Sequence, residues 1–114
     1  MAESKAARTE CFFLYVTAAS REEAVHLART LVEERLAACA NVIGPVHSFY
    51  WWGGKVEDAA EAVLVAKTQG PRVEAAIRRV KELHSYTCPC IVAWPLAAGN
   101  PAFLDWIVDE TGGG

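Results

Sequence analysis

Three side chains with metal-binding chemistry lie close together in the last third of the chain. They are His84, Cys88 and Cys90, and imidazole and thiolate groups are the ligands that copper and zinc ions prefer. Cys88 and Cys90 are two residues apart, so on an extended strand their side chains face the same side. The cluster therefore predicts a metal site whose cofactor is a copper or zinc ion.

A second interpretation of the same residues involves no metal. The spacing is not that of a zinc finger, and only one arm of a closed site is visible in the sequence. Cys88 and Cys90 then serve as small buried hydrophobic residues, and His84 caps the C-terminus of a helix. The residue types alone leave both interpretations open.

The signatures of several enzyme classes are missing from the sequence. It contains no Gly-rich phosphate loop, no Gly-x-Ser-x-Gly turn and no Cys-x-x-Cys pair. His26 lies among solvated helix positions and His47 alternates with strand aromatics, so neither has an acid or nucleophile at matched spacing. We therefore expect a protein that is not an enzyme.

Composition limits the class of protein and its partners. The chain has 114 residues, of which 53% are hydrophobic, and this is enough for one domain with a real core. The formal net charge is −3 and there is no basic run, which argues against binding to nucleic acid.

No segment has the pattern of a targeting or membrane sequence. Residues 1–9 are polar and small, and no apolar run reaches the ~18 residues of a transmembrane helix. We expect a cytoplasmic protein with reduced cysteines and no membrane partner. Residues 1–9 and 111–114 are expected to be flexible tails around a single domain, residues 10–110.

Hydrophobic periodicity predicts four strands and three helices. The strands are expected at residues 10–17, 39–52, 55–68 and 90–94. A capping box at Ser20 opens the first helix, which should end near Ala38, and prolines at 71 and 101 open the others. Gly44-Pro45 predicts a bulge in the second strand, and the prolines that bracket the fourth strand suit an edge position.

The order of these elements predicts the fold class. The first six elements form the α+β ferredoxin-like βαββαβ sandwich, to which a C-terminal helix is added. Right-handed crossovers place the first two helices on the same face of the sheet. The opposite face should therefore be open, except where the last helix covers it.

An aromatic hairpin in the middle of the chain predicts self-association. The strand that ends at Trp52 turns at Gly53-Gly54, and large side chains alternate onto both of its faces. One face carries His47, Phe49 and Trp51, and the other carries Val46, Ser48, Tyr50 and Trp52. Two helices cannot cover both faces, so we expect a partner, most simply another copy of the chain.

Several motifs in a fixed order resemble those of the CutA divalent-cation tolerance proteins, over residues 11 to 110. They are Leu36-Ala-Ala-Cys39-x-Asn41, Ser48-x-Tyr50-x-Trp52-x-Gly54, Glu61, Lys67-Thr68, His84-x-Tyr86-x-x-Pro89, Pro95 and Leu104-x-Trp106. The resemblance implies a homotrimer in which long hairpins pair between subunits. It also implies a role in divalent metal ion tolerance, with copper as the ion.

The resemblance implies a metal site at three positions, two of which differ in this chain. They fall on Val16, which cannot coordinate a metal, on His84, which is retained, and on Cys90, where the family has glutamate. A hard cation is therefore not expected here. Cys90, His84 and Cys88 remain the predicted ligands of a soft ion such as Cu(I) or Zn(II).

The resemblance also implies a ligand cleft between subunits. The residues at its recurring positions are Cys39, Asn41, Ser48, Trp52, Glu61, Lys67 and Tyr86. Lys67 offers a cation to a small anionic ligand, and Glu61 can pair with Lys67 or with a donor on the ligand. The alternative is a structural Glu61–Lys67 pair across the interface, with Trp52 as packing.

Two other functions remain open beside metal tolerance. The PII signalling proteins have a similar fold and also trimerise, so a regulatory adaptor could bind an anionic effector near Lys67. The short turn at Gly53-Gly54 argues against that adaptor, because it leaves no large exposed loop. A small oxygenase on the same fold is the third possibility.

Overall fold

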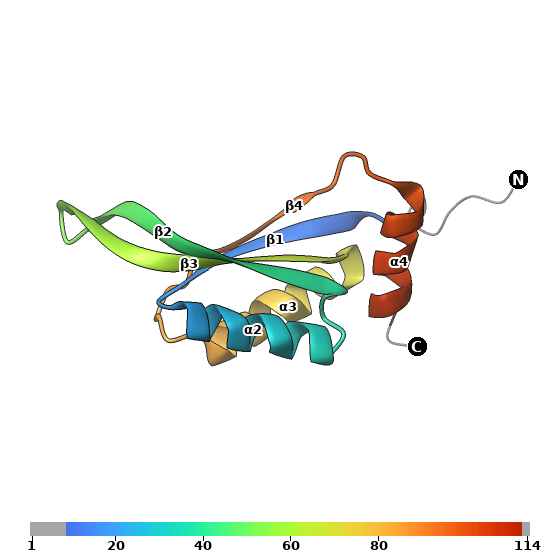
Figure 1. The fold of residues 1–114 in the computed structure, drawn as a ribbon, viewed down its shortest axis with the longest axis horizontal. Helices are drawn as coiled ribbons and strands as arrows, with labels where there is room; N and C mark the ends of the chain where they lie inside the picture. The colour runs from blue at the N-terminus through green and yellow to red at the C-terminus, as the bar shows by residue number, and fades with distance from the viewer. Residues whose placement is uncertain (1–8, 113–114) are drawn as a thin grey trace, which may run out of the picture.

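Four antiparallel strands and three helices make up the computed structural model, which describes residues 9–112. The strand order in the sheet is β2-β3-β1-β4, and Figure 1 shows helices α2 and α3 on one face of that sheet. In chain order the elements are β1 (Cys11–Ala18), α2 (Arg21–Glu33), β2 (Cys39–Trp52), β3 (Lys55–Gln69), α3 (Gly70–Leu83), β4 (Ile91–Pro95) and α4 (Pro101–Thr111). The predicted ferredoxin-like fold with an added helix is confirmed.

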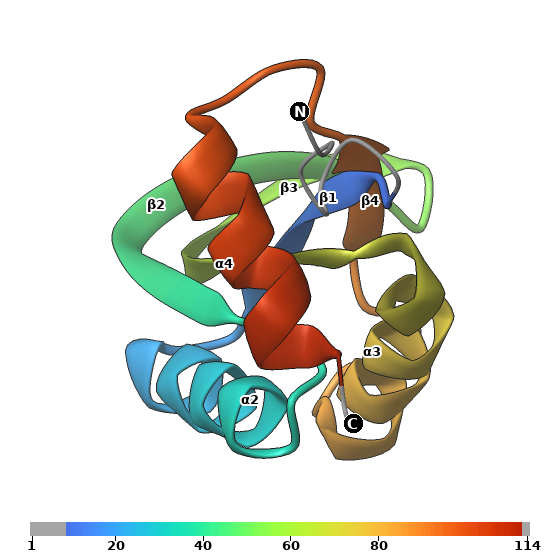
Figure 2. The same cartoon turned by 90° about the vertical axis from the view of Figure 1, so that its right-hand side faces the viewer.

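The core lies between the sheet and helices α2 and α3. Alternate residues of β1 and β3, among them Leu14, Val16 and Leu64, point toward the helices and are almost completely buried. Leu27 of α2 and Val80 of α3 meet them from the other side. Within residues 9–112, no helix covers most of the opposite face of the sheet, as predicted, and Figure 2 shows α4 crossing its end.

Helix α2 begins as predicted and ends earlier. Ser20 Oγ accepts from the Glu23 amide at 3.1 Å, and Glu23 Oε1 accepts from the Ala19 amide at 2.9 Å. The predicted end near Ala38 is wrong, because Arg35 has a positive φ of 58° and reverses the chain. The Leu36 amide then bonds back to the Leu31 carbonyl at 2.9 Å, which closes the helix.

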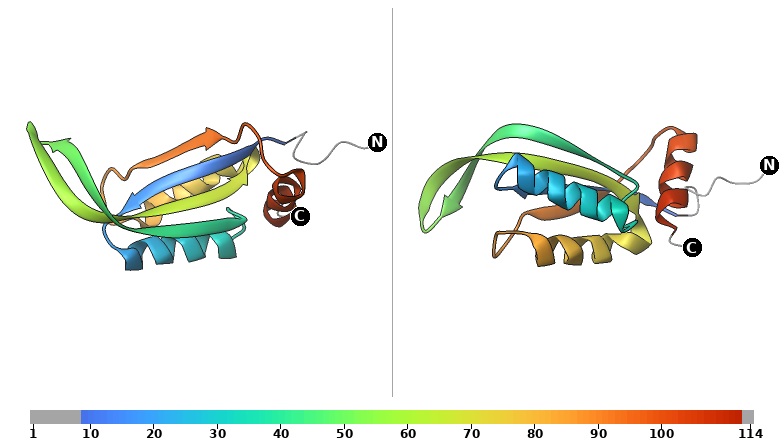
Figure 3. Two further views of the ribbon diagram at one scale, coloured as in Figure 1. Left: turned by 45° about the horizontal axis from the view of Figure 1, so that its top comes forward. Right: turned by 60° about the horizontal axis from the view of Figure 1, so that its bottom comes forward.

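Strands β2 and β3 extend beyond the other two strands as a long arm, which Figure 3 shows curving away from the helices. The longest dimension of the molecule is 56 Å, against 25 and 21 Å for the others. Gly53 and Gly54, with φ of 57° and 80°, make the two-residue turn at its tip. The predicted irregularity at Gly44-Pro45 is confirmed by a register shift between Ile43 and Val46.

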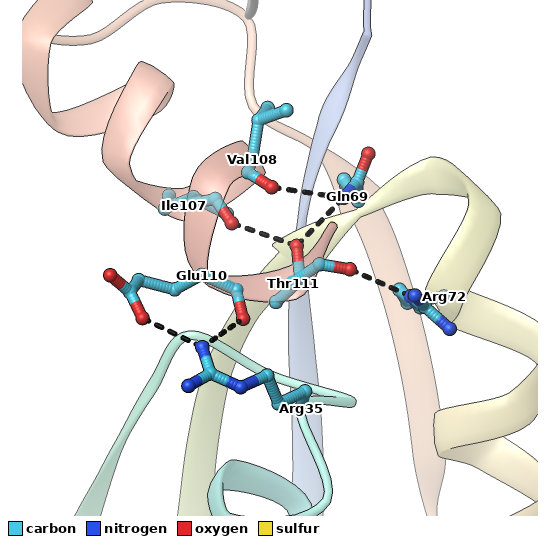
Figure 4. A network of polar contacts seen from close by, with 7 residues as sticks. All are labelled: Arg35, Gln69, Arg72, Ile107, Val108, Glu110 and Thr111. Carbon is cyan, nitrogen blue, oxygen red and sulfur yellow. Dashed lines mark hydrogen bonds and ion pairs between the residues drawn. The ribbon is translucent and has the colours of Figure 1, made fainter. Parts of the chain in front are cut away.

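A polar network holds helix α4 against the junction of β3 and α3 (Figure 4). Gln69 Nε2 donates to Thr111 Oγ1 at 2.9 Å and to the Val108 carbonyl at 3.2 Å, and Arg72 Nε donates to the Thr111 carbonyl at 2.7 Å. Thr111 was predicted to belong to a flexible tail. That is wrong, because it is the last residue of α4 and is fully buried.

The remaining sequence predictions concern the edge strand β4, the two ends of the chain and membrane-spanning helices. Among the described residues, strand β4 pairs only with β1, which confirms its predicted edge position. The rest of the predicted tails, residues 1–8 and 113–114, lies outside the described residues. Within residues 9–112, every helix is too short or too polar to cross a bilayer.

Candidate functional site

One row of side chains crosses the open face of the sheet near Lys67. Cα pairing aligns Cys39, Lys67, Phe13 and Trp94 across the four strands, and the rings of Phe13 and Trp94 stack at 4.6 Å. Lys67 Nζ donates to Asn41 Oδ1 at 2.7 Å. Because an amide is neutral, this bond orients the ammonium group without cancelling its charge.

A second polar group lies further along β3, where the arm leaves the sheet. Tyr86 Oη donates to Glu61 Oε2 at 2.7 Å, and Ser48 lies on the same face, two positions from the residue paired with Glu61. Burial, and then the hydrogen bond and negative charge of Glu61, raise the pKa of Tyr86 to about 12. Tyr86 is therefore a protonated donor throughout the neutral range.

The predicted cleft residues lie on one face of the sheet but do not form a single cluster. Glu61 and Lys67 are six residues apart on β3, which corresponds to about 20 Å along a strand. Within the chain they bond to Tyr86 and Asn41 rather than to each other. Trp52 lies further still, beside the turn of the arm, and is 71% exposed. A Glu61–Lys67 pair between subunits stays a prediction.

His84 is buried between β1 and the segment that follows α3. Its Nδ1 accepts from the Tyr86 amide at 3.1 Å, and since an amide can only donate, Nε2 carries the proton that it shares with the Thr17 carbonyl at 2.7 Å. His84 is the C-cap residue of α3, but its ring bonds to Thr17 and Tyr86 rather than to the helix carbonyls. Both ring nitrogens are thus engaged within the chain.

Glu23 also belongs to this region, although its position in the sequence does not indicate this. Its Oε2 accepts from the Ser85 amide at 2.8 Å, so one carboxylate joins the start of α2 to the segment after α3. Burial raises the pKa of Glu23, but hydrogen bonds from Ala19 and Ser85 outweigh it and lower the pKa overall. The capping box revealed one half of this role, and no local signal pointed to a contact 62 residues away.

The predicted metal ligands are not assembled into one cluster. Cys88 and Cys90 are exposed rather than buried, which contradicts their interpretation as core residues. Between residues 9 and 112, no three His, Cys, Asp or Glu side chains form a metal-binding group. Val16 lies on the helix side of the sheet with no exposed surface. Metal binding by His84, Cys88 and Cys90 therefore stays a prediction.

Comparison with known proteins gives matches along nearly the whole chain. The family model of the CutA1 divalent ion tolerance protein matches residues 12–110. The divalent-cation tolerance protein CutA of Archaeoglobus fulgidus is 48% identical over 99 residues, which are 87% of this chain and 95% of that protein.

Solved structures agree with the sequence matches. The divalent cation tolerance protein CutA1 of Thermus thermophilus superposes with a TM-score of 0.87 and 43% identity, covering 90% of this chain and 99% of that chain. The periplasmic divalent cation tolerance protein CutA of Archaeoglobus fulgidus gives 0.85 and 44%, covering 89% and 98%. The chain therefore belongs to the CutA1 divalent ion tolerance family.

Proposed function

We propose that this protein acts in tolerance to divalent metal ions, with copper as the ion, as a homotrimer that catalyses no reaction. The names of its relatives support metal tolerance. The observation that carries the assembly is the uncovered aromatic arm formed by β2 and β3. The proposed ligands are a metal ion and a small anion in a cleft between subunits.

The arm is poorly suited to an isolated chain. Phe49, Trp51 and Trp52 are 68%, 74% and 71% exposed, and they lie on both of its faces. So large an aromatic surface marks an interaction site in a water-soluble domain. The open face of the sheet continues this surface through Ile43 and Trp94, which are 52% and 44% exposed. An arm laid on the open face of a neighbouring copy covers both surfaces at once.

Native mass spectrometry of the reduced protein tests the assembly, with Trp52→Ala as the variant. Truncating an interface aromatic costs about 2 kcal/mol or more in binding free energy, which is about 30-fold in a dissociation constant. The variant should therefore dissociate at a higher protein concentration than the wild type. Trp106→Ala is the matched control, since Trp106 lies on α4 and is 39% exposed. A wild-type monomer overturns the trimer, whereas a Trp52→Ala trimer as stable as the wild type overturns the role of the arm in the interface.

The tolerance itself is tested in cells. The chain, produced in a copper-sensitive bacterial host that lacks its own relative, should restore growth on copper, and Trp52→Ala should restore less. Fractionation of the same cells tests the proposed cytoplasmic location, since the relative from Archaeoglobus fulgidus is described as a periplasmic protein. Growth that is the same with and without the chain refutes the tolerance role.

A regulatory adaptor of the PII kind is a second candidate, favoured by the environment of Lys67. Its ammonium group is held by the neutral Asn41 amide on an open, aromatic surface, where it suits an anionic effector. The two-residue turn at Gly53-Gly54 provides no long loop to contact a target. A rise in Tm with nucleoside triphosphates, absent in Lys67→Met, supports the adaptor. No rise in either protein rejects it.

A further inference from the structure

A band of aromatic side chains lies on the open face of the sheet beside Lys67. The rings of Phe13 and Trp94 stack with 4.6 Å between their centroids and 28° between their planes. Tyr15 contacts Trp94 in a tilted arrangement, with 6.2 Å between the two rings. Trp94 is 44% exposed, so its ring can still be reached by a ligand. Because aromatic rings attract other rings through stacked contacts, this band offers a surface on which a flat ring can bind.

Lys67 places a positive charge at one end of the aromatic band. It is the Cα partner of Phe13 in the pairing of β1 with β3. Its Nζ donates to Asn41 Oδ1 at 2.7 Å, and this is the one side-chain hydrogen bond that either residue makes within the part of the chain that the structure describes. The remaining ammonium protons and the amide protons of Asn41 are therefore available to an acceptor. The two oxygens of a carboxylate can accept from both groups at once.

The charges around this band suit an anion with a single negative charge. In the four strands of the described structure, the Lys and Arg residues are Lys67 and Lys55, and Lys55 lies at the tip of the arm. Burial and the negative charge of Asp105 raise the pKa of Cys11, which lies two residues before Phe13. Repulsion from Asp105 increases with the charge of a ligand. Phosphate groups usually bind to Arg clusters or helix N-termini, so a nucleoside triphosphate fits this surface poorly.

We propose that this surface binds a small aromatic carboxylate. Its ring stacks on Trp94 beside Phe13, and its carboxylate accepts from Lys67 and Asn41. Phe13 is the Cα partner of both Lys67 and Trp94, which are therefore about 10 Å apart at Cα. This spacing suits a ligand in which a short linker joins the ring to the carboxylate. The inference rests on the proposed binding of a small anion between subunits, and it names the chemical class of that anion.

Isothermal titration calorimetry of the purified protein with phenylacetate tests the proposal. Cyclohexylacetate keeps the carboxylate but cannot stack, and we expect it to bind about 2–10-fold more weakly. Phenylacetamide keeps the ring but has no charge, and we expect it to bind about 10–100-fold more weakly. Trp94→Leu should abolish the first preference and Lys67→Met the second. Trp106→Leu is the matched control, since Trp106 lies on α4 and is 39% exposed, and it should keep both preferences.

The proposed site is wrong if the wild-type protein takes up no phenylacetate, or if it binds cyclohexylacetate equally well. Binding of ATP through Lys67 without binding of phenylacetate would also overturn it, in favour of a nucleotide effector. Equal melting curves before titration show that the variants are folded. Native mass spectrometry of the same samples tests the assembly separately. A monomer with both preferences retains the site and counts against the cleft between subunits, whereas a trimer that binds none of the probes counts against the aromatic carboxylate alone.

Discussion

Replacing Tyr86 by phenylalanine gives a sharp test of the polar group around Glu61. The substitution removes one hydroxyl and with it the 2.7 Å hydrogen bond to the Glu61 carboxylate. Hydrogen bonds to charged groups are worth about 1.5–3 kcal/mol, and the lower figure applies here because Tyr86 keeps some contact with solvent. At pH 8 we therefore expect Tyr86→Phe to lower the free energy of unfolding by about 1.5 kcal/mol.

Because of the same hydrogen bond, we expect the stability of the folded protein to fall at alkaline pH. The pKa of Tyr86 rises from its ordinary value of 10.0 to about 12 in the folded protein, so the folded state holds this proton more tightly than the unfolded chain does. Its stabilising effect is complete below pH 10 and is lost as the pH rises to 12. One pKa unit corresponds to about 1.36 kcal/mol, so this rise stabilises the folded protein by at most about 2.7 kcal/mol.

Urea unfolding at fixed protein concentration, repeated between pH 8 and pH 12, measures both effects. The gap between wild type and Tyr86→Phe should be largest at pH 8 and should close as Tyr86 ionises. Tyr15→Phe serves as the control for the loss of a half-buried hydroxyl elsewhere on the open face. A gap that stays constant across this range, or that Tyr15→Phe reproduces, would refute the reasoning.

Three further substitutions test other parts of the fold. Thr111→Val keeps the shape of the side chain but removes an acceptor from Gln69, and should cost about 1–3 kcal/mol in urea unfolding. Leu64→Ala opens a cavity at a fully buried position and should cost about 2–5 kcal/mol by the same measurement. The pKa of Glu23 is lowered in the folded protein, so its carboxylate stabilises the fold above its ordinary pKa of 4.5 and this stabilisation is lost as the pH falls. Glu23→Gln should therefore make stability depend less on pH in acid unfolding followed by circular dichroism. An unchanged acid midpoint in that variant would mean that the contact between Glu23 and Ser85 contributes nothing.

Hydrophobic periodicity predicted the strands and helices because, in both kinds of element, the residues that are buried recur at the period of that element. Residues such as Leu14 and Val16 alternate toward the helices, and this pattern is visible in the sequence without any structure. The end of α2 was missed because the apolar pattern continues through Leu36 after the helix has stopped. Arg35 reverses the chain with a positive φ that a residue of this type rarely adopts, so no composition rule indicates it.

The features that the sequence did not predict depend on contacts between residues that are far apart in the chain. Thr111 precedes three glycines and has the local pattern of a tail, and only Gln69 and Arg72, about forty residues earlier, show that it is buried. Family resemblance named Glu61 and Tyr86 as cleft residues, but it could not show that they bond to each other. Their sequence separation of 25 residues carries no local signal.

The distance between the two polar groups on the open face decides what kind of cleft is possible. Lys67 and Glu61 point to the same side of β3 about 20 Å apart, which is further than one small ligand reaches. A site that uses both charges must therefore bring Lys67 of one copy toward Glu61 of another. The arm beyond Glu61 carries the exposed aromatic surface that such a docking would bury. Binding of a ligand whose anionic group pairs with Lys67 and whose donor pairs with Glu61 should then disappear whenever the assembly does. Trp52→Ala should therefore weaken this binding together with the oligomer, although Trp52 lies far from Lys67 within its own chain.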